Sequence, residues 1–420
     1  MFEKIKASSL MGALAIMLAA LFWSIDGLFI RPQFYNLPAD LVVFLEHTLG
    51  FLVLCPFIYF SWDKIRFLSK KSWGAIIWVC FFGGMLGTIM ITKAFFAAMG
   101  GETTFATVVI LQKLQPFFAL LLAGLILKER LSKEFYLWTA VAIIASYFIA
   151  FGKSGLQLSE INWFHNAAFF AFLAAFSFGS STVFGKRITN HLDYKAVAAL
   201  RFGITALMVL VLVLFNNTFS QFKTITSLQW ELFALIVLTS GAGAMFIYYF
   251  GLRKVSASAA TILELFWPFS AIILDYVFNK NILTSVQIIA VFALLAAFTR
   301  VSMLDKLNVK FSAQIIRGKG RGEELGFKTA NLDNVDLDIP YGVYTVLIKV
   351  KEKEYNGLMH FGLKETFNEP PSMEVLIKDF SEDIYGQKAE VKIIRKLREV
   401  KKFKSKDLLV EEVRKNLAQI

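Results

Sequence analysis

Residues 315–332 read I-I-R-G-K-G-R-G-E-E-L-G-F-K-T-A-N-L, a polar, glycine-rich stretch that follows a long apolar N-terminal part. Its glycines leave room for backbone N–H groups to approach a phosphate closely. They are Gly318, Gly320, Gly322 and Gly326. Thr329 and Asn331 follow two residues apart, so in an extended segment their oxygens point the same way and can reach a metal ion or a phosphate. Glycines in loops form tight turns more often than nucleotide-binding loops, so this stretch alone does not distinguish the two interpretations. The rest of the sequence is needed to choose between them.

The composition indicates a membrane protein. Of the 420 residues, 56% are hydrophobic and only 18% are charged, whereas soluble domains have roughly 25% charged residues. The net charge of +12 comes mainly from basic residues that sit between apolar runs. That pattern is typical of loops on one face of a membrane rather than of nucleic-acid binding, so we expect a lipid bilayer and no nucleic acid as partner.

Ten apolar runs are long enough to cross a bilayer. They lie at about residues 10–29, 41–61, 73–96, 104–127, 135–151, 166–185, 197–215, 232–251, 257–278 and 286–301. The first run is long for a signal peptide and no small-x-small cleavage site follows it, so we interpret it as an uncleaved span. We therefore predict an all-α membrane domain of ten helices in residues 1–303.

The charges of the loops predict an orientation. With a cytoplasmic N-terminus, the inner loops hold Lys64, Arg66, Lys70, Lys71, Lys128, Arg130, Lys133, Lys186, Arg187, Lys195, Arg253 and Lys254. The outer loops then hold only Arg31, Lys153, Lys223 and Lys280. This positive-inside bias and the even number of spans predict that both termini lie in the cytoplasm. We therefore expect a multi-pass protein of the cell (inner) membrane.

The apolar part contains an internal repeat. Residues 17–31 align with residues 172–187, and residues 104–116 align with residues 256–268. The second alignment matches Leu111 with Leu263, Gln112 with Glu264, and Pro116 with Pro268. Since each half has five predicted spans, the second half would be inverted relative to the first, which places a substrate site near the midplane between them.

These features resemble the EamA branch of the drug/metabolite transporter superfamily. The resemblance rests on the ten spans in two halves, on the Leu-x-x-x-x-Pro element of the fourth and ninth spans, and on Lys128-Glu129-Arg130-Leu131. It covers about residues 8–303 and implies a transporter fold, without specifying the solute.

Ionisable and aromatic residues inside the spans are the candidates for solute contact, since buried charges in a membrane are expensive. The strongest are Glu264, its repeat counterpart Gln112, Trp267, Trp23, Glu46 and Lys93. Further candidates are Asp26, His47, Lys113, Arg201 and Asp275. The carboxyl of Glu264 can accept substrate hydrogen bonds or carry a coupled proton; the alternative is a structural ion pair with Lys93 or Lys113. The two indoles can stack on a planar ring.

The hydropathy pattern of the sequence changes after residue 303, where the long apolar runs end. Residues 304–310 have the character of a linker, and strand-like alternation begins at residue 311. The clearest alternating segments are V-Y-T-V-L-I-K-V-K (343–351), M-E-V-L-I (373–377) and A-E-V-K-I-I-R-K-L (389–397). Residues 405–418 show helical spacing after Ser405, a good N-cap. We predict a small cytoplasmic β-barrel with a C-terminal helix in residues 311–420.

Ordered motifs along this tail resemble those of the riboflavin kinase family. They are Gly320-Arg321-Gly322, Gly326-Phe327-Lys328-Thr329-Ala330-Asn331, Tyr341-Gly342-Val343-Tyr344, Phe361-Gly362 with Thr366-Phe367, Met373-Glu374-Val375, Asp383-Ile384-Tyr385-Gly386, and Leu397-Arg398 with Lys402-Phe403. The resemblance implies an enzyme that phosphorylates riboflavin with ATP. No G-x-x-H-x-G-H-type nucleotidyl motif precedes it, so the expected product is FMN and not FAD.

The resemblance also implies the roles of single residues. Thr329 and Asn331 are implied to hold Mg²⁺ and the ATP phosphates, and Glu374 is implied to be the catalytic base for the ribityl 5′-hydroxyl. The glycine-rich loop is implied to bind ATP through Gly320, Arg321, Gly322 and Gly326. Lys328 and Glu365 stand where the family has prolines, which loosens two loops near the ligands.

Taken together, the two parts predict riboflavin uptake followed by phosphorylation at the cytoplasmic face. Two alternatives stay open on the sequence. One is a transporter of another small metabolite with an independent kinase tail. The other is a transporter regulated by an inactive flavin-binding tail.

Overall fold

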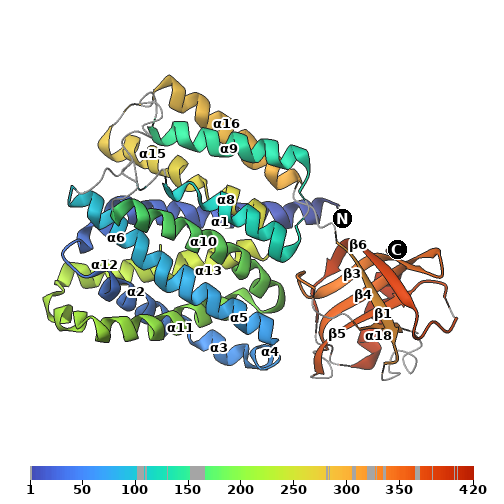
Figure 1. Cartoon of the computed structure of the whole chain (residues 1–420). Coiled ribbons are helices and arrows are strands. Elements are labelled where there is room, and N and C mark those ends of the chain that lie inside the picture. Colours follow the sequence, from blue (N-terminus) through green and yellow to red (C-terminus); the bar gives the residue numbers. More distant parts are fainter. Residues whose placement is uncertain are drawn as a thin grey trace. The chain divides into compact units, whose positions relative to one another are not determined.

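The computed structural model describes residues 2–420 except 102–107, 109–110, 130, 152–165, 281, 283, 305–308, 319–326, 328, 334–336, 365–368, 381, 402 and 404. Within that range the side chains of residues 2–8, 150–151, 166, 275, 279, 364, 369 and 406 are also outside the description. The chain divides into two compact units, Met1–Asp305 and Lys306–Ile420. The first is built from helices and the second from strands with one helix (Figure 1).

The first unit, called the membrane unit below, has helices along its whole described length. Up to residue 151 they are α1 (Phe2–Ile25), η1 (Asp26–Ile30), η2 (Arg31–Phe34), α2 (Ala39–Leu54), α3 (Pro56–Phe60), α4 (Trp62–Ile65), α5 (Lys70–Trp78), η3 (Val79–Leu86), α6 (Gly87–Met99), α8 (Gln115–Leu122), η4 (Ala123–Leu127) and α9 (Lys133–Phe151). After residue 165 they are α10 (Asn166–His191), α11 (Tyr194–Phe215), η6 (Thr218–Thr224), α12 (Ser227–Leu238), α13 (Ala242–Leu252), α14 (Ala257–Leu263), α15 (Phe266–Asn279) and α16 (Ser285–Leu304).

Seven helical segments within the described residues are long and apolar enough to cross a membrane. They are Ser9–Phe34, Lys70–Met99, Ala167–His191, Tyr194–Phe215, Ser227–Leu252, Ala257–Phe278 and Ser285–Leu304. The predicted span at 41–61 is divided, because Pro56 begins a separate short helix after α2. Part of the predicted span at 104–127 lies outside the described residues, and its described part includes the shorter apolar helix Gln115–Leu127.

The outer surface of the membrane unit is apolar, as lipid contact requires. Leu52 is 63% exposed, Phe292 is 69% exposed and Leu238 is 70% exposed. Water would disfavour so much exposed apolar surface, whereas lipid tails accept it. The chain is therefore a multi-pass membrane protein.

Four of the seven described spanning segments are interrupted: at η1, at η3, between α12 and α13, and between α14 and α15. The α-helix of the first segment gives way at Asp26 to the π-helix η1 and then to the 3₁₀-helix η2. The segment Ser227–Leu252 is broken between α12 and α13, where Thr239 has ψ −92° and Gly241 has ψ −108°. Interruptions of this kind free backbone groups and often mark functional sites in transporters.

The second unit is a closed, antiparallel barrel in the order β1-β2-β5-β4-β3-β6. Its strands are β1 (Lys310–Ile316), β2 (Thr329–Leu332), β3 (Gly342–Val350), β4 (Lys353–Lys364), β5 (Glu369–Ile377) and β6 (Lys388–Arg398). Alternate side chains fill the interior, among them the fully buried Tyr344, Met359 and Val375. The helix α18 (Lys406–Leu417) begins at Ser405, whose side chain accepts a hydrogen bond from the Leu408 amide. The predicted barrel with a C-terminal helix is confirmed.

Candidate functional site

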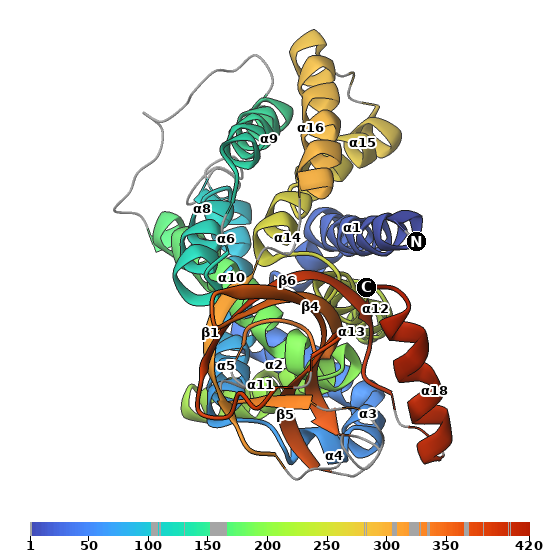
Figure 2. The ribbon, with the colours of Figure 1, turned by 90° about the vertical axis from the view of Figure 1, so that its right-hand side faces the viewer.

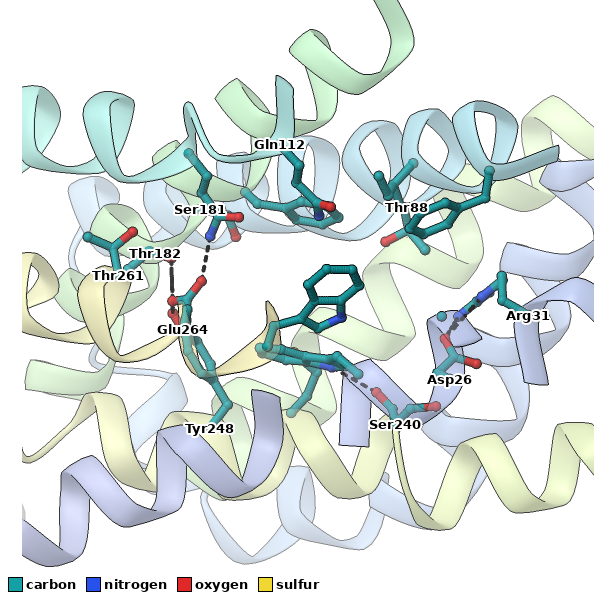
Figure 3. A pocket seen from close by; sticks show the side chains of 18 of the residues that line it. Asp26, Arg31, Thr88, Gln112, Ser181, Thr182, Ser240, Tyr248, Thr261 and Glu264 are labelled. Atoms are coloured by element: carbon teal, nitrogen blue, oxygen red, sulfur yellow. Dashed lines mark hydrogen bonds and ion pairs between the residues drawn. The ribbon is translucent and has the colours of Figure 1, made fainter. Parts of the chain in front are cut away.

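The membrane unit contains a cavity of about 1290 Å³ that is partly open to solvent. Its lining comes from segments far apart in the sequence, on both sides of residues 152–165 (Figure 3). It includes side chains of η1, α2, α6, α8, α10, α11, α13 and α14. Ligand sites of transporters are commonly formed in this way, by side chains of helices that are distant in the sequence.

At one end of the cavity, Glu264 follows α14 and receives hydrogen bonds from three neutral side chains (Figure 3). Tyr248 donates its hydroxyl to Oε1 at 2.7 Å, and Thr182 donates its hydroxyl to the same oxygen at 3.3 Å. The Gln115 amide donates to Oε2. The donors come from α13, α10 and α8, so this carboxyl joins elements that precede and follow residues 152–165. None of these bonds is an ion pair with Lys93 or Lys113, the alternative considered for Glu264.

At the other end, one guanidinium joins two carboxylates (Figure 3). Arg31 donates to Asp26 Oδ2 from Nη2 at 2.6 Å and from Nε at 3.1 Å. Its Nη1 donates to Glu46 Oε2 at 3.0 Å. All three residues are at least 93% buried, so we call them the buried triad. The triad links η1 and η2 to α2, and Arg31 is therefore a cavity residue and not the outer-loop charge that the sequence indicated.

Aromatic rings lie between these two ends. Trp23 donates its indole N–H to the Ser240 carbonyl at 2.9 Å, and its ring centroid lies 5.4 Å from that of Tyr248. Trp267 also lines the cavity, and the Lys113 ammonium lies 5.3 Å from its ring centroid. The cavity therefore offers flat apolar surfaces as well as hydrogen-bonding groups, which suits a planar polar solute.

Most of the predicted transport residues meet in this cavity. The lining contains Trp23, Asp26, Glu46, His47, Gln112, Lys113, Arg201, Glu264 and Trp267. Lys93 is not part of it: its side chain is exposed, with the ammonium 5.6 Å from the Phe170 ring centroid. The side chain of Asp275 lies outside the described residues. Five further polar residues line the cavity and were not predicted from the sequence: Arg31, Gln115, Thr182, Ser240 and Tyr248.

The predicted kinase residues that the structure describes, Glu374, Thr329 and Asn331, lie on the outer face of the barrel. Along β5 the residues Met373 and Val375 are buried and Glu374 between them is not, so Glu374 points away from the interior. In β2 the same alternation turns Thr329 and Asn331 outward. Asn331 pairs directly with Glu374 across the β2–β5 ladder. Directly paired residues have neighbouring side chains, so the predicted base and a predicted metal ligand are adjacent.

The pairing extends to the next strand. His360 of β4 pairs with Glu374 on its other side, so Asn331, Glu374 and His360 form a row across three strands. The backbone of Gly318 lies directly against the Asn331 carboxamide, where a Cβ atom would collide with it. Gly320, Arg321, Gly322 and Gly326 lie outside the described residues. His360 was not a predicted site residue; its signal is its position on the outward face of a strand beside Glu374.

The outward-facing oxygen donors of β2 fit Mg²⁺. Among the described residues, no group of three His, Cys, Asp or Glu side chains is placed to hold a metal ion. Mg²⁺ does not need such a cage in kinases, since it takes oxygen ligands and keeps waters and phosphate oxygens in its shell. The hydroxyl of Thr329 and the carboxamide oxygen of Asn331 are ligands of that type, and they share one face of β2.

Comparison with known proteins places each unit in a family. The EamA-like transporter family matches residues 10–151 and 165–303, and the riboflavin kinase family matches residues 306–420. The "Riboflavin transporter ImpX" of Fusobacterium nucleatum is 36% identical over 297 residues, which are 70% of this chain and 98% of that protein. One solved structure, described as "Crystal structure of protein", covers 70% of this chain and 97% of its own at 15% identity and a TM-score of 0.51, a likeness of fold alone.

The second unit has relatives of its own. The "RNA-binding riboflavin kinase RibR" of Bacillus subtilis is 37% identical over 106 residues, 25% of this chain and 46% of that protein. The "Bifunctional riboflavin kinase/FMN adenylyltransferase" of the same organism is 36% identical over 108 residues, 24% of this chain and 34% of that protein. The chain thus spans less than half of either of these two relatives. Its membrane unit belongs to the EamA-like transporter family, and residues 306–420 form a riboflavin kinase domain.

Proposed function

We propose that the membrane unit carries riboflavin into the cell and that the kinase domain converts it to FMN. One observation carries the proposal: a membrane unit similar to a protein named as a riboflavin transporter is joined in one chain to a riboflavin kinase domain. Riboflavin, a solute with a planar ring, suits the indole-lined cavity. FMN bears a phosphate with about two negative charges, which lipid excludes, so phosphorylation would retain the vitamin inside.

The membrane unit is proposed to have ten spans in two inverted repeats. Support comes from the ends of the fourth and ninth spans, since Lys128 follows Pro116 at the same spacing as Lys280 follows Pro268. Both lysines adopt the left-handed conformation, with φ 55° and 60°. The packing of the helices supports the repeat as well. Helix α1 of the first half packs on α13 of the second half, and α10, the counterpart of α1, packs on α6, the counterpart of α13. Likewise α2 packs on α11, and α9 packs on α16 (Figure 2).

Both termini are proposed to lie in the cytoplasm, at the cell membrane. The positive-inside bias supports this orientation. Burial of Arg31 in the triad strengthens the bias, because it removes one basic residue from the outer loops. A cytoplasmic tail would lie where ATP is available.

Glu374 is proposed as the catalytic base of the kinase domain. Its carboxylate would accept the proton of the ribityl 5′-hydroxyl while that oxygen forms a bond to the γ-phosphorus of ATP and ADP leaves. Asn331, the direct neighbour of Glu374, would hold Mg²⁺ together with Thr329. A bound Mg²⁺ supplies charge neutralisation at the phosphates. Gly320, Arg321, Gly322 and Gly326 are proposed to contact the ATP phosphates, as the family resemblance implies.

The transport proposal is tested by uptake of labelled riboflavin into proteoliposomes that contain the full-length chain and no ATP. We expect saturable uptake that unlabelled riboflavin inhibits and that unrelated sugars and amino acids do not. Without ATP the kinase domain cannot trap the solute, so the initial rate reports transport alone. Uptake equal to that of empty liposomes would mean that the membrane unit carries another solute and that the kinase domain acts independently of it.

A further inference from the structure

Two of the helix interruptions, at η1 and between α12 and α13, meet at the triad end of the cavity. Asp26 is the first residue of the π-helix η1, and Ser240 lies in the break between α12 and α13. Both side chains line the cavity, and Figure 3 shows them side by side. Asp26 is 7% exposed and Ser240 is 4% exposed, so neither reaches bulk solvent. Two interrupted helices thus present two polar side chains to one point of the cavity wall.

Each of these side chains keeps one buried oxygen that makes no hydrogen bond within the described part of the chain. These atoms are Asp26 Oδ1 and Ser240 Oγ. Both Arg31 bonds go to the other oxygen of Asp26, and the Trp23 bond goes to the Ser240 carbonyl rather than its hydroxyl. The Ser240 hydroxyl lies near the Asp26 carboxylate (Figure 3), so a ligand hydroxyl that enters at this point would contact both side chains. Buried polar atoms of this kind normally have a partner, so the pair is arranged for a group that enters the cavity.

The charges around the pair indicate a neutral ligand group. Arg31 pairs with both Asp26 and Glu46. The nearby Arg201 contributes to compensating the charge of these two carboxylates. Along the described lining, three acidic side chains (Asp26, Glu46, Glu264) face three basic ones (Arg31, Lys113, Arg201). An added cation or anion would disturb this balance. A hydroxyl group would not, and it can donate to Asp26 Oδ1 while it accepts from Ser240 Oγ.

We propose that Asp26 and Ser240 form a subsite for the hydroxyl groups of a polyhydroxylated chain on the solute, with the ring of the solute beside the indoles of Trp23 and Trp267. The subsite rests on the proposed function, since riboflavin combines a planar ring with a ribityl chain. It assigns the chain to the triad end of the cavity. A hydroxyl-recognition site of this type discriminates strongly against an analogue that lacks the hydroxyls, because its polar atoms then stay unpaired.

The test compares riboflavin with lumiflavin, which has the same ring and a methyl group in place of the ribityl chain. Full-length S240A protein is reconstituted without ATP, and the KM of riboflavin uptake and the Ki of lumiflavin are measured. The matched control is S146A, since Ser146 is also fully buried but donates to the Ile143 carbonyl in α9 and does not line the cavity. We expect the riboflavin KM of S240A to rise about tenfold, the effect of roughly one lost hydrogen bond in a dry site.

The lumiflavin Ki of S240A should stay unchanged, so the ratio of the lumiflavin Ki to the riboflavin KM should fall. S146A should leave both constants as in the wild type. An unchanged ratio of the two constants in S240A would overturn the subsite, whether both constants rise by the same factor or both stay at the wild-type value. Wild-type protein that takes up no riboflavin would instead refute the proposed function, and the subsite with it.

Discussion

Glu374 lies on the outer face of the barrel between two strands that carry other site residues. Its neighbours in the ladders are Asn331 and His360. In the proposed role, the Glu374 carboxylate would accept the proton of the substrate hydroxyl while the adjacent Asn331 helps to hold the metal-bound phosphates.

Replacement of Glu374 by Gln removes the proton acceptor and keeps the size of the side chain. We expect FMN formation by E374Q to fall by a factor on the order of 10²–10⁴, the usual contribution of general base catalysis. The measurement is FMN production from riboflavin and Mg-ATP by purified full-length protein. The control is E390Q, since Glu390 lies exposed on β6 of the same barrel. Unchanged turnover in E374Q would remove Glu374 from the role of base.

Gly318 controls the position of Asn331. A Cβ atom at residue 318 would collide with the carboxamide of Asn331, so G318A should displace this side chain. Small displacements of catalytic groups reduce rates on the order of tenfold to a hundredfold. We expect this reduction in FMN formation, with a higher Mg²⁺ concentration needed for half-maximal rate. The control is G74A, where nothing lies within 4 Å of the new Cβ. An unchanged Mg²⁺ dependence in G318A would show that Asn331 does not hold the metal.

At the residue scale, the sequence predicts the cavity only in part. Glu264, Trp23 and Trp267 could be found, because charges and aromatic residues within apolar runs stand out. Ser240 and Thr182 could not, since small hydroxyl residues in membrane helices usually satisfy their own backbone. Arg31 was misassigned to a loop because it lies just beyond the apolar run. Only the fold shows that η1 and η2 turn it back onto Asp26 and Glu46.

The buried triad connects the end of the first spanning segment to α2. R31M would keep much of the apolar volume but leave two buried carboxylates without their cation, which destabilises proteins by about 3–5 kcal/mol. We expect a large decrease in the melting temperature of the detergent-solubilised protein. R66M is the control: Arg66 pairs with Asp63 at the surface, with side chains 40% and 78% exposed. Such surface pairs contribute at most about 1 kcal/mol. Equal decreases in the two variants would refute the structural role of the triad.

Glu129 connects the loop after η4 to the start of α14, the helix that leads to Glu264. It accepts hydrogen bonds from the Ala257 and Ser258 amides at 2.9 and 3.2 Å and from the Ser258 hydroxyl at 2.5 Å. Loss of a helix cap of this kind costs about 0.5–2 kcal/mol. We expect E129A to lower the rate of riboflavin uptake while E134A, at an exposed position of α9, leaves it unchanged. Wild-type uptake by E129A would show that this contact does not position α14 for transport.

At the element scale, periodicity predicts most of the structure. Alternation identified β3, β5 and β6, and the N-cap Ser405 identified the start of α18. The short strand β2 carries no such signal, because a four-residue strand is too brief to show alternation. The break between α12 and α13 was also missed. The hydropathy of this segment indicates one continuous apolar run, so the break at Thr239, Ser240 and Gly241 is not visible in it.

At the scale of the whole molecule, the change from an apolar to an alternating sequence after residue 303 predicted two different parts, and ordered motifs predicted the family of each. The solute could not be predicted in the same way. The residues that select a solute are single side chains brought together by many helices, and they leave no ordered motif in the sequence. The inference about riboflavin therefore depends on the similarity to a protein named as a riboflavin transporter and on the joining of the two parts in one chain, which makes the linkage of uptake to phosphorylation the central claim.

That claim is tested most directly by the accumulation of labelled flavin in proteoliposomes loaded with Mg-ATP. Wild-type protein is compared with E374Q, which keeps the cavity intact. We predict that with ATP inside, the wild type accumulates flavin above the external concentration, as FMN, while E374Q stops at equal concentrations of riboflavin on both sides. Without ATP the two proteins should behave alike. If accumulation by the wild type did not depend on ATP, or if E374Q accumulated as much flavin as the wild type, uptake and phosphorylation would not be linked in this protein.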